Sequence, residues 1–178
     1  EVLPEFITKV ANSGCSVFII HARKALLQGL SPKDNRIIPP LQYPLVYEMQ
    51  KNFPGLDIIL NGGLTELKEI KSCVKNRVAG VMIGREAYEN PSILLNVDNE
   101  IFDQKEKVRS MKDAIRNMIE YCNREKAEGT AIKGILKHLK GAFKGRANSK
   151  EFKRVLFCNE TTDSEKLERL SNLVPIYC

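Results

Sequence analysis

The chain has 178 residues, of which 43% are hydrophobic and 28% charged, a composition that excludes a disordered tail and is typical of a folded globular protein. Lys and Arg outnumber Asp and Glu by 28 to 22; this excess favours a polyanionic partner, and a surplus scattered over the surface explains it equally well. The length permits either one complete domain or part of a domain followed by a smaller one.

The five cysteines form no CxxC pair, and none has the spacing of a metal site. Their odd number also argues against a closed set of disulfides, so we expect an intracellular, reducing compartment and no metal. No apolar run reaches the roughly 18 residues of a membrane span, and residues 1–15 lack a signal-peptide pattern. The expected location is thus cytoplasmic or organellar, and because the chain begins like an excerpt from something longer, any targeting segment is expected upstream.

The first hundred residues alternate predicted helices and strands. In chain order we expect a helix at 1–12, a strand at 15–20, an irregular loop at 22–42, a helix at 43–52, a strand at 57–60, a capped helix at 65–74 and a strand at 78–83. The strands are apolar without alternation, which predicts burial on both faces. This regular order indicates a parallel sheet, in either a doubly wound fold or a barrel.

From Lys105 onward the strand signals stop. Helices are predicted at 105–127, 130–144, 149–157 and 163–173. Phe143, Phe152 and Phe157 have helical spacings that suit core packing. The region is also basic, with KGAFKGR at 140–146 and KEFKR at 150–154, although such clusters are often ordinary solvated helix faces.

Polar residues follow each of the three predicted strands. They are His21-Ala-Arg23-Lys24, Asn61-Gly62-Gly63 and Gly84-Arg85. Barrel enzymes build their sites at the carboxyl ends of strands, and the loops after the last two strands often hold a phosphate. Glycines allow backbone N–H groups to approach that phosphate closely. Each motif alone is explained by a simple turn or a structural histidine, but their occurrence at three successive strand ends favours a phosphate or flavin site.

Three longer stretches carry a family resemblance: FIIHARKALLQGLSPKDNRIIPPLQYPLVYEMQKNFP, NGGL and GVMIGREAYENPSIL. They closely resemble the tRNA-dihydrouridine synthases, specifically the DusA-type subgroup. The resemblance covers residues 6–102 and extends more loosely into 135–156. It implies an α/β fold in which residues 1–103 are the C-terminal portion of an FMN-binding (β/α)8 TIM barrel and residues 104–178 are a small all-α, helical tRNA-binding domain.

The resemblance also implies roles for individual residues. For FMN these are His21, Asn61, Gly62, Gly63, Gly84 and Arg85. For RNA they are Lys33, Arg36, Lys150 and Lys153, where the last two replace residues that are usually Arg in related proteins. A solvated helix face remains the alternative for the last two lysines, and Lys140, Lys144 and Arg146 are interpreted as plain surface.

The implied reaction is the FMN-dependent reduction of uridine to 5,6-dihydrouridine in tRNA, with NADPH as reductant and a loop cysteine as proton donor. None of the five cysteines here matches that motif, so we expect the catalytic residue upstream, this chain alone to be inactive, and the intact protein to be monomeric. Two alternatives remain open. One is another FMN barrel oxidoreductase, such as a dihydroorotate-dehydrogenase-like protein, and the other is a non-catalytic RNA-binding module.

Overall fold

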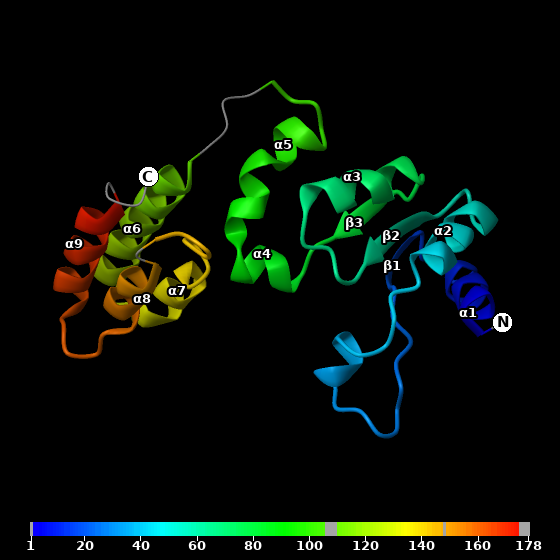
Figure 1. The fold of residues 1–178 in the computed structure, drawn as a ribbon, viewed down its shortest axis with the longest axis horizontal. Helices are drawn as coiled ribbons and strands as arrows, with labels where there is room; N and C mark the ends of the chain where they lie inside the picture. Colours follow the sequence, from blue (N-terminus) through cyan, green and yellow to red (C-terminus); the bar gives the residue numbers. More distant parts are fainter. Residues whose placement is uncertain (1, 106–109, 148, 175–178) are drawn as a thin grey trace. The chain divides into compact units, whose positions relative to one another are not determined.

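The computed structural model describes residues 2–105, 110–147 and 149–174. The chain divides into two compact units, Glu1–Gly84 and Arg85–Cys178 (Figure 1). This division lies upstream of the functional domain boundary expected after residue 103, and that boundary stays a prediction.

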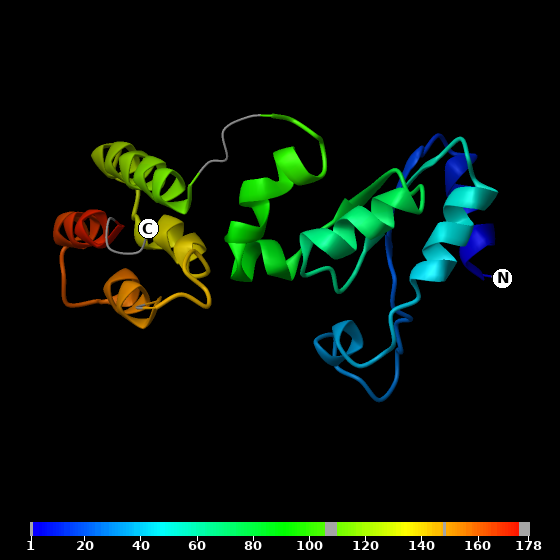
Figure 2. The same cartoon turned by 45° about the horizontal axis from the view of Figure 1, so that its top comes forward.

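The first unit contains a three-stranded parallel sheet in the order β1-β2-β3. Its elements are α1 (Val2–Ala11), β1 (Val17–His21), the 3-10 helix η1 (Asp34–Arg36), α2 (Tyr43–Asn52), β2 (Asp57–Asn61), α3 (Leu67–Lys75) and β3 (Gly80–Met82). The predicted alternation and the parallel sheet are therefore confirmed, although β3 is shorter than the predicted strand at 78–83. Helices α2 and α3 lie along the sheet in Figures 1 and 2.

One face of this sheet is packed and the other is open. The packed side consists of Phe18, Ile58 and Leu60 with Ile7, Val46, Met49, Ile70 and Cys73 from the three helices, all buried. On the opposite face, Val17 is 48% exposed, Ile19 56% and Met82 41%. The prediction of strands buried on both faces is therefore wrong for β1 and β3, because within the described residues the helices cover only one side.

The side chain of Gln50 ties α2 to the sheet at the amino-terminal ends of two strands. Its Oε1 accepts hydrogen bonds from the backbone N–H of Ile58 at 3.1 Å and of Ala79 at 3.2 Å. Its Nε2 donates to the carbonyl of Leu56 at 2.9 Å. A half-buried amide that satisfies backbone groups beside two neighbouring strands fixes their offset as well as the position of the helix.

Among the described residues of the second unit, the regular elements are all helices, joined by turns and loops. Its elements are α4 (Arg85–Glu89), the 3-10 helix η2 (Pro91–Asn96), α5 (Val97–Glu100), α6 (Met111–Ala127), α7 (Lys133–Leu136), the 3-10 helix η3 (Lys137–Leu139), α8 (Ser149–Phe157) and α9 (Asp163–Leu173). The predictions for α8 and α9 are confirmed. The start predicted for α6 falls partly on residues 106–109, which lie outside the described residues. None of the described helices is long and apolar enough to cross a membrane.

The helix predicted at 130–144 is wrong as a single element. It ends after α7 and η3, and turns occupy 140–147. At Gly141 the backbone packs against α4 so closely that a Cβ atom would lie 2.5 Å from the carbonyl oxygen of Glu89 and 2.6 Å from that of Tyr88. This approach, together with the low helix propensity of glycine, favours turns here.

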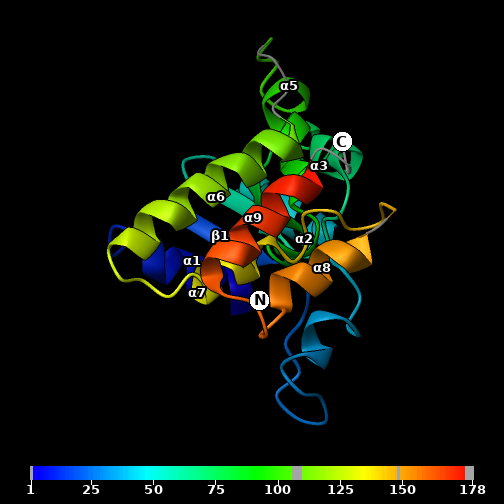
Figure 3. The same cartoon turned by 90° about the vertical axis from the view of Figure 1, so that its left-hand side faces the viewer.

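Helices α6 to α9 enclose a core of their own, and α6 and α9 pack against each other (Figure 3). The rings of Phe143 and Phe152 meet edge to face at 4.8 Å between centroids, and both are buried as predicted. Phe157, by contrast, is 44% exposed. The prediction of core packing is wrong for this residue because five positions along a helix carry it well away from the face of Phe152.

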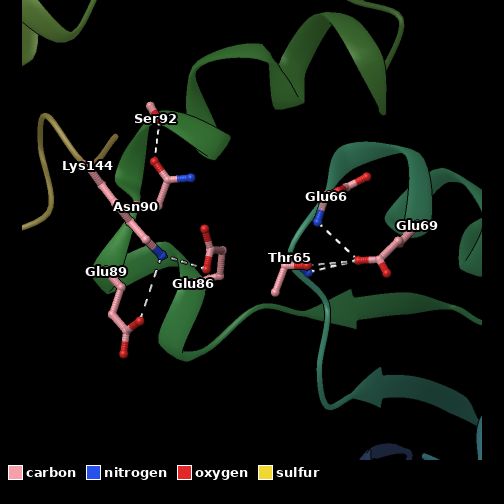
Figure 4. A network of polar contacts seen from close by, with 8 residues as sticks. All are labelled: Thr65, Glu66, Glu69, Glu86, Glu89, Asn90, Ser92 and Lys144. Atoms are coloured by element: carbon pink, nitrogen blue, oxygen red, sulfur yellow. Dashed lines mark hydrogen bonds and ion pairs between the residues drawn. The ribbon is translucent and has the colours of Figure 1, made fainter. Parts of the chain in front are cut away.

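Side chains cap several of these helices. At α3 the Glu69 carboxylate accepts hydrogen bonds from the backbone N–H of Thr65 at 3.0 Å and of Glu66 at 3.1 Å (Figure 4). Thr162 caps α9, where the predicted helix start is confirmed, and the Glu165 carboxylate accepts from its backbone N–H at 2.8 Å. This hydrogen bond, with a second from the Thr162 hydroxyl, lowers the pKa of Glu165.

Candidate functional site at the carboxyl ends of the strands

The three strand ends of the first unit meet at one edge of the sheet, because the strands are parallel. His21 and Asn61 are paired in register at the ends of β1 and β2, and Gly84 follows the end of β3 at Met82 by two residues. Both paired residues point to the same, open face of the sheet. The structure therefore brings together the histidine, the asparagine and the glycine turn that the sequence singled out.

The turn after β2 requires glycine at two successive positions. Gly62 has a φ of 126° and Gly63 a φ of 68°, in the region that side chains rarely adopt. A Cβ atom on Gly63 would lie 2.6 Å from Cδ1 of Leu41. Within the described part of the chain, no hydrogen bond satisfies the backbone N–H of either glycine. Two unsatisfied donors in one tight turn are suited to an anion such as a phosphate.

Tyr43 holds this turn in place, and sequence reasoning missed it. Its hydroxyl donates a hydrogen bond of 2.6 Å to the carbonyl oxygen of Gly62. Burial raises the pKa of Tyr43, and the nearby Cys73 and Glu69 raise it further, so the phenol stays protonated and continues to donate. The only signal was its place as the first residue of the helix that follows the long loop, and nothing local paired it with a glycine nineteen residues away.

The loop at 22–42 is anchored to the same edge. The Ala22 N–H donates to the Asn61 carbonyl at 2.7 Å, and the Gln42 N–H donates to the Ala22 carbonyl at 2.7 Å. Arg23 forms a β-bridge with Leu41 and donates from Nη1 to the carbonyl of Pro39. The two ends of this long loop are therefore held together beside the glycine turn.

Lys33 and Arg36 lie farther out in this loop, next to and within η1. The side chain of Asn35 keeps the segment compact, because it accepts from the Leu26 N–H at 2.7 Å and donates to the Leu26 carbonyl at 2.8 Å. Lys33 is exposed, and Arg36 donates from Nε to the Pro32 carbonyl at 2.9 Å. Both cations are thus presented on an ordered part of the loop.

The other predicted residues belong to the second unit. Arg85 opens α4, is exposed, and follows Gly84 directly in the chain. Lys150 and Lys153 lie on α8, where the first is exposed and the second is half-buried. The two pairs of predicted RNA-binding residues therefore belong to different units.

The described cysteines offer no candidate for the proton donor at the strand ends. Cys73 and Cys122 are buried, Cys158 is half-buried on the second unit, and Cys15 precedes β1 at the opposite end of the strand. In the described ranges, His, Cys, Asp and Glu side chains form no group of three or more suited to a metal ion.

Comparison with known proteins identifies the family of this chain. The family profile for dihydrouridine synthase (Dus) matches residues 1–175. The chain belongs to the dihydrouridine synthase family. This confirms the resemblance found in the sequence, and an α/β fold with a parallel sheet agrees with it.

Relatives from several bacteria carry one name, tRNA-dihydrouridine(20/20a) synthase. The chain is 45% identical over 157 residues to the protein of Escherichia coli K12, covering 88% of this chain and 45% of the relative. It is 42% identical over 176 residues to that of Salmonella typhi, covering 97% and 53%, and 44% identical over 155 residues to that of Vibrio cholerae, covering 86% and 47%. The chain spans about half the length of the curated relatives it matches.

Proposed function

We propose that the intact protein reduces uridine to 5,6-dihydrouridine in tRNA, using FMN as cofactor and NADPH as reductant. Family membership and the shared name of the relatives support this reaction. The observation that carries it in the structure is the edge where His21, Asn61 and the Gly62-Gly63 turn lie together, with N–H groups in the turn that no described residue accepts from.

The residues at this edge fit the phosphate of FMN. The N–H groups of Gly62 and Gly63 would donate to its oxygens, and Tyr43 would hold the turn in shape. His21 and Asn61 would contact the cofactor from the neighbouring strand ends, and Gly84 and Arg85 would supply the second phosphate-binding turn. When bound, the flavin supplies the hydride chemistry, and the protein orients the reactants around it.

The open face of the sheet supports the assignment of residues 1–103 to part of a TIM barrel. In a closed barrel one face of every strand points inward, where bulky side chains fill the interior. Val17 and Ile19 on β1 and Met82 on β3 are apolar side chains of this kind on the exposed face. Further strands of the intact protein would cover them, and a cysteine on a loop outside this chain would donate the proton to the uracil ring.

The helical domain at 104–178 would bind tRNA together with the long loop. Lys33 and Arg36 on the loop, and Lys150 and Lys153 on α8, would contact the RNA backbone. The ammonium groups of the three lysines serve this purpose as point charges, without the bidentate geometry that Arg provides. Binding of this kind depends on backbone charge and shape, and is therefore sensitive to salt.

The test uses the intact protein, unmodified tRNA, NADPH and FMN. We expect bound flavin and the formation of dihydrouridine, measured by mass spectrometry of the digested tRNA. Changing Arg85 to Ala should weaken FMN binding by about one to two decades, since a charge-assisted hydrogen bond contributes about 1.5–3 kcal/mol. Arg77→Ala is the matched control, because Arg77 is also exposed but lies before the amino end of β3.

The outcomes separate the alternatives. Equal FMN affinity in the two variants would reject the role of Arg85. A flavoprotein that reduces no uridine would point to another FMN barrel oxidoreductase, and a protein that binds tRNA without flavin would be a non-catalytic RNA-binding module.

A further inference from the structure

A basic pocket lies within the second unit, between the end of α4, the turn that follows η3, and α8. Its volume is about 340 Å3, and it is lined by Tyr88, Glu89, Lys140, Gly141, Lys144 and Lys153. We call it the α4–α8 pocket. It contains one of the two α8 lysines already proposed to bind RNA, together with two lysines that sequence reasoning interpreted as plain surface.

Close packing builds the wall of this pocket. The backbone of Gly141 lies directly against the carbonyl groups of Tyr88 and Glu89, with no room for a side chain. The Tyr88 hydroxyl donates to the carbonyl of Lys137 at 3.4 Å, and its ring meets that of His138 edge to face at 5.7 Å. The end of α4 is therefore held in place against the turn.

Helix α8, which forms another side of the pocket, is also held in place by packing. The buried ring of Phe152 anchors α8 against Phe143 in the core, and Lys153 is the next residue along the helix. It is half-buried, whereas Lys150, one turn earlier on the same helix, is exposed and does not line the pocket. The structure thus distinguishes two lysines that the sequence treated as a pair.

The charges in the pocket are not balanced. Lys144 lies 3.4 Å from the Glu86 carboxylate and 3.9 Å from that of Glu89 (Figure 4). Lys140 and Lys153 have no ion-pair partner among residues 2–105, 110–147 and 149–174. Two uncompensated ammonium groups in one pocket attract an anion.

An exposed aromatic ring lies beside these two cations. Tyr88 is 47% exposed although its hydroxyl has a hydrogen-bond partner and its ring contacts that of His138. Unpaired RNA bases stack on such rings, and lysines beside them contact the adjoining phosphates. The pocket volume is at the lower end of the range of about 300–1,000 Å3 for ligand sites, which suits one nucleotide of a longer strand.

We propose that the α4–α8 pocket binds one nucleotide of the tRNA, with Lys140 and Lys153 on its phosphates and the Tyr88 ring stacked on its base. This proposal rests on the proposed function, because it takes tRNA as the substrate. It adds Tyr88 and Lys140 to the RNA-binding surface and gives Lys153 a larger role than Lys150.

The test measures the affinity of the intact protein for unmodified tRNA over a range of salt concentrations. We expect the Lys140→Ala/Lys153→Ala variant to bind on the order of tenfold more weakly, and the slope of log K against log salt to fall by roughly 1.4–1.8, because each lost phosphate contact accounts for about 0.7–0.9. The control is Lys137→Ala/Arg154→Ala. It removes the same charge from residues adjacent to the pocket that do not line it, and it should change the slope much less.

A second set of variants tests the stacking contact separately. Tyr88→Leu should weaken binding about fivefold or more without changing the salt slope, because it removes a ring and no charge. Tyr88→Phe keeps the ring and should retain the affinity. Thermal melting of each variant shows whether the unit remains folded, and the lysine variants decide the proposal even if Tyr88→Leu unfolds it.

Each result has one meaning. Equal salt slopes for the pocket variant and the control, in a protein that makes dihydrouridine, would overturn the pocket and leave the proposed function standing. An unaltered protein that neither binds tRNA nor makes dihydrouridine would overturn both. A reduced slope confined to the pocket variant supports the proposal.

Discussion

The two units bury their apolar side chains in different ways. In the second unit, helices α6 to α9 surround a shared core that includes Ile115, Phe152 and Leu170. In the first unit, helices pack on one face of the sheet, while Val17 and Ile19 on the other face remain about half exposed. Both units thus bury apolar side chains, but the first also presents an apolar face of its sheet.

This difference bears on the candidate site. The side chains of His21 and Asn61 belong to the open face, so whatever covers that face also borders the site. The glycine turn, by contrast, is held by Leu41 and Tyr43 from the same unit. We therefore expect the turn to keep its shape in this chain alone and the remainder of the site to be completed only in the intact protein.

The largest expected effect tests the closed core of the second unit. Changing Phe152 to Ala should lower the free energy of unfolding of this unit by about 3–5 kcal/mol, because the side chain is buried and leaves a cavity. Phe157→Ala, on the same helix but 44% exposed, should cost less than about 1 kcal/mol. Denaturant unfolding followed by circular dichroism measures both, and equal losses would show that this core is not closed as described.

The next prediction compares the two faces of the sheet. In residues 1–178, Ile58→Ala should cost about 2–5 kcal/mol, since Ile58 is buried. Ile19→Ala should cost only about 0.5 kcal/mol there, because its side chain is 56% exposed. In the intact protein the cost of Ile19→Ala should rise to about 2 kcal/mol or more. A cost that stays small in both proteins would mean that nothing covers this face.

The smallest expected effect concerns the glycine turn. Gly63→Ala should cost about 1–2 kcal/mol for its left-handed backbone, and more because the new Cβ would meet Leu41. Gly55→Ala is the control, since its Cβ would meet nothing within 4 Å and should be nearly neutral. The double change Gly63→Ala/Leu41→Ala should recover the part of the lost stability that is due to the contact between the new Cβ and Leu41. Full additivity of the two changes would argue against that contact.

Much of the fold follows from local patterns in the sequence. The bounds of α2, α8 and α9 agree with those predicted from the sequence, and the alternation of helices with short apolar runs predicted three parallel strands. The residues at the strand ends were found because parallel strands present their carboxyl ends at one edge. These features depend on periodicity and on the conformational freedom of glycine, which are properties of neighbouring residues in the chain.

The tertiary structure decided what those patterns left open. An apolar residue in a strand gives the same sequence pattern whether or not its face of the sheet is covered. The exposure of Val17 and Ile19 therefore depends on which face of the sheet the helices pack against. The Tyr43–Gly62 hydrogen bond and the pocket containing Tyr88 and Lys153 join residues far apart in the chain. Such contacts are set by the packing of whole elements, and no local spacing encodes them.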